Sequence, residues 1–315
     1  MLQHQSRTVR YIPRIPSHPF SHGIRVGELA DFEAFTKKFI HLVEIMKARY
    51  GYKVSVDVEA ELARYQAFAD AMKDYIIDTV AYLAQVCTSS ALAFIDSQAR
   101  KNGKKILIEG ANAAMLDLDF GTYPYVTSSS PTIGGCLTGL GVPSHSINRV
   151  IGITKAYTSR VGSGPFPTEC LDDMGDKLRS IGHEFGTTTG RPRRCGWLDL
   201  TQMRYSCNIN GYTEIALTKL DILSHFDEIK VGLSYVKNGE RITDFPSDLN
   251  SLEGIEMEWK SFPGWKEDIT KCTKYSELPA NARAYIEFIE SELETPIYYI
   301  GVGPQREAIV IKEKA

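Results

Sequence analysis

The sequence Ile215-Ala216-Leu217-Thr218-Lys219-Leu220-Asp221 joins an apolar run to a polar turn. Its first four residues have the character expected of a buried β-strand, and two charged residues follow as soon as the run ends. In sheets of parallel strands, ligands bind at the carboxyl ends of the strands, where the following loops begin. The stretch therefore predicts a strand that leads directly into a binding site.

Apolar runs of the same kind recur on both sides of this stretch. The other predicted strands are Lys104 to Glu109, Val150 to Ile153 within the run from Ser146 to Thr158, Ile297 to Ile300, and Ala308 to Ile311. Ala280 to Leu293 has a helical pattern, and Val231 to Phe245 alternates about Asn238-Gly239, a pair typical of a type I′ hairpin turn. Strands that alternate with helices predict an α/β fold with a central, mostly parallel sheet and flanking helices.

The N-terminal third has a helical pattern from Leu29 to Gln98, with apolar side chains at steps of three and four residues. The two apolar stripes are Phe32, Phe35, Phe39, Leu42, Ile45 and Met46, and then, between about Val58 and Val86, Leu62, Tyr65, Phe68, Met72, Ile76 and Val80. We expect one domain over residues 23–315, made of a helical subdomain (29–98) and an α/β part (104–315). Residues 1–22 are expected to form an irregular tail.

Composition excludes several classes of protein. The chain has 315 residues, a formal net charge of −3 and 43% hydrophobic residues. It therefore lacks the strongly basic balance that general binding to nucleic acid or membrane surfaces requires. No apolar run reaches the roughly 18 residues of a transmembrane helix. Six scattered cysteines without a C-x-x-C pair argue against a zinc site or a disulfide framework and for a reducing compartment.

The first 27 residues contain four arginines and no acidic residue, a composition that organellar transit peptides share. Pro13, Pro16 and Pro19, however, prevent the amphipathic helix that such peptides form. We therefore expect a cytoplasmic protein, with organellar targeting as the alternative.

The loop from Gly186 to Arg194 has the chemistry of an anion-binding site. Two glycines, Gly186 and Gly190, permit positive φ angles, and the three threonines between them offer hydroxyl groups. Three arginines follow, and guanidinium groups bind carboxylates or phosphates through paired hydrogen bonds. The alternative is a solvated basic turn, but Trp197 and Leu198 follow at once and predict that the loop is anchored to the core.

The turn after Thr218 is suited to guanine. The Asp221 carboxylate can accept two hydrogen bonds from the N1–H and amino group of guanine, whereas adenine would leave the acid unpaired. The Lys219 stem can lie against a base, and the turn Gly301-Val302-Gly303-Pro304 would form the second wall of the pocket. The alternative is a surface ion pair between the lysine and the aspartate.

Asn112 follows the run Glu109-Gly110-Ala111 with an amide able to donate and accept, and Thr127, Ser128 and Ser129 form a hydroxyl cluster suited to phosphate oxygens. Local turn capping is the alternative for each of them. The run Arg160-Val161-Gly162-Ser163-Gly164 is not a phosphate loop of the Walker type, because no Gly-Lys-Ser/Thr follows. For His183 and Glu184 a structural role is favoured over acid–base chemistry, because the sequence names no partner for them.

Taken in order, these motifs resemble those of the adenylosuccinate synthetases, in the form seen in eukaryotes. The resemblance covers roughly Gly23 to Ile311. It rests on Thr122-Tyr123-Pro124 through Ser129, Gly164 to Glu169, Thr188-Thr189-Gly190-Arg191, Cys195-Gly196-Trp197-Leu198-Asp199, and Pro263-Gly264-Trp265. Family members join IMP to L-aspartate with GTP and Mg²⁺, giving adenylosuccinate on the route to AMP. GTP phosphorylates the 6-oxygen of IMP, and the aspartate amine then displaces the phosphate.

The resemblance assigns a ligand to each candidate residue and implies a homodimer. IMP is matched by Asn112, Thr127 and Arg191. L-Aspartate is matched by Thr187, Thr188, Thr189, Gly190, Arg191 and Arg193. GTP is matched by Arg193, Lys219, Leu220, Asp221, Gly301, Val302 and Gly303. Each assignment agrees with the chemistry expected from the residue types alone.

The sequence also departs from the family. Family members begin with a Gly-Asp-Glu-Gly-Lys-Gly-Lys phosphate loop, whose aspartate is the catalytic base and a magnesium ligand. A Gly-His-Thr motif supplies the catalytic histidine, and a loop ending in Gly-Ile-Gly-Pro contacts the IMP phosphate. None of these runs occurs in this sequence, and Ser21 stands where the family has an arginine that reaches the IMP site of the partner subunit.

From these departures we expect a chain that lacks about the first quarter of the enzyme, so that its sheet is incomplete and one edge is exposed. No catalytic or metal-binding residue is identifiable, and we expect no ligase activity from this chain alone. Two alternatives stay open. One is a non-catalytic descendant that binds nucleotide or acts as a regulatory subunit, and the other is an unrelated α/β module whose basic loop contacts nucleic acid.

Overall fold

The computed structural model describes residues 23–51, 55–78, 82, 107–187 and 189–313. The chain divides into two compact units, one of Met1–Leu107 with Gly139–Val142 and the other of Ile108–Thr138 with Pro143–Ala315. We call them the helical unit and the α/β unit.

The helical unit contains two α-helices whose starts are fixed by aspartates. Its elements are η1 (Val26–Ala30), α1 (Phe32–Tyr50), α2 (Val58–Met72) and η3 (Lys73–Tyr75). The side chains of Asp31 and Asp57 accept hydrogen bonds from the backbone N–H groups three residues later, which satisfies donors that a helix leaves free at its start. The helices pack through aromatic rings, with centroids 5.3 Å apart for Phe35 and Tyr65.

The structure shortens the second predicted helix. Helix α2 ends at Met72 rather than near Val86, and the single turn η3 follows it. Phe68 and Met72, predicted on the packed stripe, are 47% and 38% exposed. Val80 and the residues from 83 to 98 lie outside the described part of the chain. Among the described helices, none combines the length and the apolar character needed to cross a bilayer.

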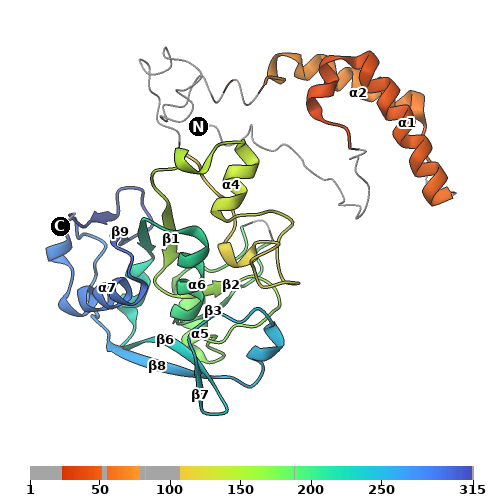
Figure 1. The fold of residues 1–315 in the computed structure, drawn as a ribbon. Coiled ribbons are helices and arrows are strands. Elements are labelled where there is room, and N and C mark those ends of the chain that lie inside the picture. The colour runs from red at the N-terminus through yellow and green to blue at the C-terminus, as the bar shows by residue number, and fades with distance from the viewer. Residues whose placement is uncertain (1–22, 52–54, 79–81, 83–106, 188, 314–315) are drawn as a thin grey trace. The chain divides into compact units, whose positions relative to one another are not determined.

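The α/β unit contains the predicted, mostly parallel sheet (Figure 1). Its order is β1-β5-β9-β10, formed by β1 (Ile151–Lys155), β5 (Glu214–Thr218), β9 (Ile297–Gly301) and β10 (Ile309–Ile311). The first three strands are parallel and β10 is antiparallel to β9. This arrangement confirms the α/β fold expected from the sequence.

Smaller sheets complete the unit. A second sheet consists of β4 (Leu198–Asp199), β6 (Glu228–Lys237), β7 (Glu240–Ile242) and β8 (Glu256–Pro263), and β2 (Thr158–Arg160) pairs with β3 (Arg194–Gly196). Asn238 and Gly239 join β6 to β7 with φ angles of 54° and 81°. Positive φ at both central residues is the geometry of the predicted type I′ turn.

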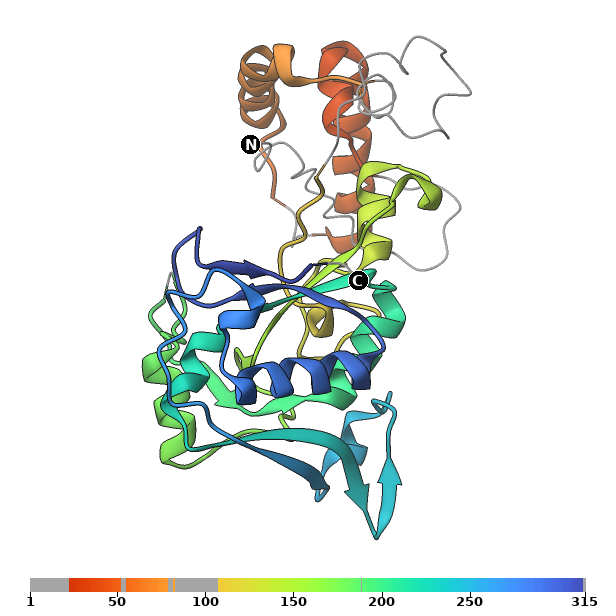
Figure 2. The same cartoon turned by 90° about the vertical axis from the view of Figure 1, so that its left-hand side faces the viewer.

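The remaining elements cover and connect the sheets. They are η6 (Ala114–Leu116), α4 (Ile133–Leu140), η7 (Ser144–Ser146), α5 (Asp173–Ile181), α6 (Leu200–Asn210), η8 (Leu220–His225), η9 (Leu249–Leu252), η10 (Tyr275–Glu277) and α7 (Ala280–Leu293). Helix α7 lies between the two larger sheets (Figure 2). Its buried Tyr285 packs against Phe262 of β8 and donates a hydrogen bond of 2.6 Å to the carbonyl of Ala156, directly after β1.

Two strand predictions differ from the structure. Strand β1 was expected to be buried, but Ile153 is 78% exposed and Ile151 38% exposed. Within the described residues, β1 is an edge strand and only one of its faces packs on the core. Leu107–Glu109 form no strand, and the rest of the predicted strand from Lys104 lies outside the described residues.

Candidate anion-binding site at the sheet edge

The carboxyl ends of β1, β5 and β9 lie next to one another, because β5 pairs with both neighbours in parallel. Strand β5 leads into Lys219, and β9 ends at Gly301. A Cβ atom placed on Gly301 would lie 3.2 Å from the Cα of Thr218 and 3.6 Å from the backbone nitrogen of Lys219. The two segments predicted as walls of a base pocket are therefore in contact.

Lys219 turns the chain after β5 and points toward a different loop. Its φ of 60° lies in the left-handed region, which reverses the chain direction. Its Nζ donates to the carbonyl of Gly182 at 2.6 Å and to Glu184 Oε1 at 2.9 Å. The predicted alternative, a surface ion pair with Asp221, is not the pairing in the structure. Asp221 is half-buried, and this burial raises the pKa of its carboxyl group.

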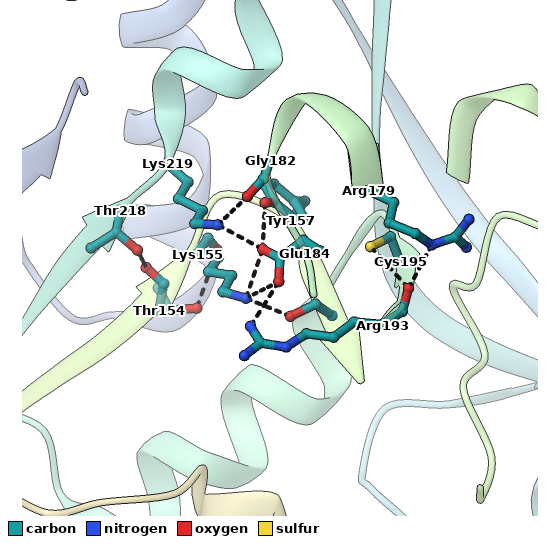
Figure 3. Close-up of polar contacts among 11 residues, drawn as sticks. Thr154, Lys155, Tyr157, Arg179, Gly182, Glu184, Arg193, Cys195, Thr218 and Lys219 are labelled. Atoms are coloured by element: carbon teal, nitrogen blue, oxygen red, sulfur yellow. Dashed lines mark hydrogen bonds and ion pairs between the residues drawn. The ribbon is translucent and has the colours of Figure 1, made fainter. Parts of the chain in front are cut away.

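Glu184 is the centre of the site (Figure 3). Its side chain is fully buried and accepts hydrogen bonds from four residues. These are Lys155 Nζ at 2.8 Å to both oxygens, Tyr157 Oη at 2.6 Å and Lys219 Nζ at 2.9 Å to Oε1, and Arg193 Nη1 at 2.9 Å to Oε2. Burial opposes ionisation, but the hydrogen bonds from Lys155, Lys219 and Tyr157 outweigh it and lower the Glu184 pKa to about 2.

Three cations surround this single carboxylate. The side chains of Lys155, Arg193 and Lys219 are 26%, 29% and 33% exposed, so each keeps some access to solvent. Burial lowers the pKa of Lys155, and the charges of Lys219 and Arg193 add to this effect against the attraction of Glu184. The buried Nε of Arg193 has no hydrogen-bond partner among the described residues. The cluster therefore has two excess positive charges, a balance that favours the approach of an anionic ligand.

The loop that carries Arg193 is a short hairpin. Gly186 N–H donates to the carbonyl of Arg191, Gly190 N–H to the carbonyl of Gly186, and Arg193 N–H to the carbonyl of Glu184, at 2.8, 2.8 and 2.9 Å. Gly190 has the predicted positive φ, 65°, whereas Gly186 is not among the glycines with positive φ. Gly186 is instead favoured because there is little room for a side chain, since a Cβ there would lie 3.0 Å from Thr189 Oγ1.

The structure leaves the tip of this loop accessible. Thr187, Thr189, Gly190 and Arg191 are exposed, and Thr188 lies outside the described residues. The residues after the loop are anchored as predicted, with Trp197 and Leu198 5% and 2% exposed.

Asn112 and Thr127 lie in a separate segment of the same unit. Asn112 has a φ of 73°, and its Nδ2 donates to Ser129 Oγ at 3.4 Å. The Thr127 N–H donates to the carbonyl of Leu116 at 2.9 Å. Arg160 Nη2 ties this segment to β2 through Thr122 Oγ1 at 3.0 Å. That Asn112, Thr127, Arg191 and Asp221 line one cleft stays a prediction.

A cavity of about 440 Å³ lies beside this segment, lined by Tyr125, the run Gly164–Pro167 and five residues between Leu249 and Ile255. None of the predicted ligand residues lines it.

Lys155, Tyr157 and Glu184 are the site residues that sequence reasoning missed. Glu184 was noticed beside His183, but a structural role was favoured because no partner could be named. The structure supplies four partners, and it leaves His183 exposed. A lysine two residues after the apolar run of β1 was the available signal.

The described residues lack a metal-binding cluster of side chains. No group of three or more His, Cys, Asp or Glu side chains in the described part of the chain is arranged to hold a metal ion. The described residues therefore do not fit a Mg²⁺ ion held by protein side chains alone.

The fold and the site define a class: an α/β protein with cationic and hydroxyl-bearing loops at the carboxyl ends of parallel strands, the place where such proteins bind anionic ligands. Comparison with known proteins defines the family. The adenylosuccinate synthetase family model matches residues 17–310, and the chain belongs to this family.

Individual relatives agree with this assignment. Adenylosuccinate synthetase of Coprinopsis cinerea is 50% identical over 292 residues, which cover 93% of this chain and 65% of the relative. The enzyme of Schizosaccharomyces pombe is 52% identical over 291 residues, 92% of this chain and 64% of the relative. A solved structure of fully ligated adenylosuccinate synthetase from Plasmodium falciparum is 44% identical and superposes with a TM-score of 0.78 over 93% of this chain and 66% of that chain. The chain thus spans just under two thirds of the length of these relatives.

Proposed function

We propose that this chain provides binding sites for IMP, GTP and L-aspartate in the GTP-dependent formation of adenylosuccinate for AMP biosynthesis. The observation that supports this most is the meeting of Arg193 and Lys219 on one carboxylate, beside the Gly301 turn. The two cations come from different loops, each expected to contact a different part of the ligands. The family membership of the chain agrees with this proposal.

The hairpin loop is proposed to bind L-aspartate. Its members are Thr187, Thr188, Thr189, Gly190, Arg191 and Arg193. An exposed tip with hydroxyls and a guanidinium suits a small dicarboxylate, because charge-assisted hydrogen bonds to carboxylates are about twice as strong as neutral ones. Arg193 is proposed to contact both aspartate and GTP.

The loops after β5 and β9 are proposed to bind the guanine of GTP. Their members are Lys219, Leu220, Asp221, Gly301, Val302 and Gly303. The Asp221 carboxylate would accept the two hydrogen bonds of the guanine edge, while adenine would leave this half-buried acid without donors. IMP is proposed to contact Asn112, Thr127 and Arg191, whose amide, hydroxyl and guanidinium match its phosphate and base.

We further propose that the 315-residue polypeptide binds these ligands without turning them over by itself. Its sequence contains neither a Gly-Asp-Glu-Gly-Lys-Gly-Lys run nor a Gly-His-Thr motif. Groups placed to transfer protons or to stabilise developing charge supply most of an enzyme's rate enhancement. A chain without them can bind the ligands, but the reaction between the bound ligands stays slow. A homodimer in the cytoplasm is proposed from the family membership, although one relative, from Chlamydomonas reinhardtii, is described as chloroplastic.

Calorimetric titration of the purified chain with GDP, IMP and L-aspartate tests the proposal, together with a coupled assay for adenylosuccinate. We expect saturable binding of all three and no turnover. Turnover at the level of a complete enzyme would contradict the inactive state, and absence of GDP and L-aspartate binding would contradict the proposed sites. Binding to RNA or DNA that weakens steeply with salt would instead support the nucleic-acid alternative.

A further inference from the structure

The two oxygens of Glu184 serve two different loops. Oε2 accepts from Arg193 of the hairpin loop and Oε1 from Lys219 of the loop after β5, both at 2.9 Å (Figure 3). Lys155, at the end of β1, contacts both oxygens at 2.8 Å. A single carboxylate therefore sets the positions of two cations from separate ligand-binding segments.

Glu184 itself is held firmly. Its N–H donates to the carbonyl of Arg179 and its carbonyl accepts from the N–H of Arg193, each at 2.9 Å. The fully buried Tyr157 donates to Oε1 at 2.6 Å. Because the carboxylate is buried and fixed from these directions, it can orient the longer and partly exposed side chains of Arg193 and Lys219.

We propose that Glu184 is a positioning residue that couples ligand binding at two places. These are the hairpin loop, proposed to bind L-aspartate, and the loops after β5 and β9, proposed to bind guanine. The inference rests on the proposed function, because it assumes that Arg193 and Lys219 face those ligands. An anion that draws Arg193 toward itself removes a donor from Oε2, and the charge of Glu184 then acts more strongly on Lys219. Lys155 stays on both oxygens and keeps the carboxylate paired. Occupation of one site thereby changes the affinity of the other, and the effect is reciprocal.

The coupling is measured by titrating the chain with GDP in the absence and in the presence of saturating L-aspartate. For the wild type we expect the two GDP affinities to differ by about fivefold or more. In Glu184→Gln, which keeps the size of the side chain and removes its charge, the difference should fall below about twofold. A purely structural role for Glu184 would lower stability and leave this ratio unchanged.

Glu169→Gln is the matched control. Glu169 pairs with Arg194, 2.8 Å from its Nε, and this ion pair lies outside the Glu184 cluster. The control should keep the wild-type coupling ratio. If it lost the ratio as Glu184→Gln does, the effect would not be specific to Glu184 and the inference would fail.

A second variant covers the case in which Glu184→Gln does not fold. Glu184→Gln combined with Lys155→Met removes one cation along with the anion, so the cluster keeps its two excess positive charges. The same loss of coupling is expected. A folded variant of either kind with the wild-type ratio, or a wild type that binds both ligands independently, would overturn the inference and leave the proposed function standing. If the wild type bound neither ligand, the proposed function would fail first.

Discussion

Glu184→Gln should lower the free energy of unfolding of the α/β unit at neutral pH. The cluster lowers the pKa of this carboxyl group from 4.5 to about 2, which corresponds to about 3 kcal/mol in favour of the folded state. The partner cations are a quarter to a third exposed, so solvent screens part of the interaction. We therefore expect a loss of about 2 to 3 kcal/mol at pH 7.

The loss should depend on pH in a defined window. Because the folded pKa lies below the unfolded value, the stabilisation is fully present above about pH 4.5 and disappears as the pH falls toward 2. The difference between wild type and Glu184→Gln should thus be nearly the same at pH 7 and pH 5. At pH 3.5 it should fall to roughly 60% of that value.

Urea unfolding followed by tryptophan fluorescence measures this difference. All three tryptophans, Trp197, Trp259 and Trp265, belong to the α/β unit, so the signal reports that unit alone. Glu169→Gln serves as the control and should lose less, because the Glu169 side chain is 16% exposed and has one cationic partner, whereas Glu184 is fully buried among three. A loss below about 0.5 kcal/mol at pH 7, or one that does not change between pH 5 and pH 3.5, would refute the reasoning.

Three further substitutions test single residues. Asp221→Asn should reduce the preference for GDP over ADP by about tenfold or more, because an amide cannot accept both guanine hydrogen bonds; an unchanged preference in calorimetric titrations would remove Asp221 from the pocket. Arg191→Leu should weaken the binding of IMP and of L-aspartate by about tenfold each, because charge-assisted hydrogen bonds are lost. Unaltered affinity for both ligands in calorimetric titrations would support the alternative of a solvated basic turn. Gly301→Ala should cost about 1 kcal/mol or more of unfolding free energy, since the new Cβ would lie 3.2 Å from Thr218 Cα; a constant urea midpoint would argue against that close contact.

The four strands of the mostly parallel sheet and α7 could be predicted because their signals are local. Ile297–Gly301 and Ala280–Leu293 are apolar or periodic runs bounded by turn residues, and the structure places them where the pattern does. The exposure of one face of β1 could not be predicted, because an apolar run does not show which elements will pack against each face of the strand. The early end of α2 at Met72 has the same origin, since apolar residues continue at helical spacing beyond it.

The candidate site likewise has a part that local sequence patterns predict and a part that they do not. The threonine and arginine loop and the turn after β5 were recognisable from residue types within a few positions of each other. The Glu184 cluster was not, because Lys155 lies 29 residues and Lys219 35 residues away in the chain. Their meeting depends on the parallel pairing of β1 with β5 and on the hairpin that returns Arg193, which no local pattern specifies.

The imbalance of three cations around one acid has a cost for the ligand-free protein. The three positive charges repel one another, so we expect a small polyanion at this place to reduce the repulsion and stabilise the folded state. Phosphate or sulfate in a purification buffer would therefore act as a competitor and as a stabiliser at once. We therefore expect melting temperatures in phosphate or sulfate to exceed those in chloride solutions of low ionic strength.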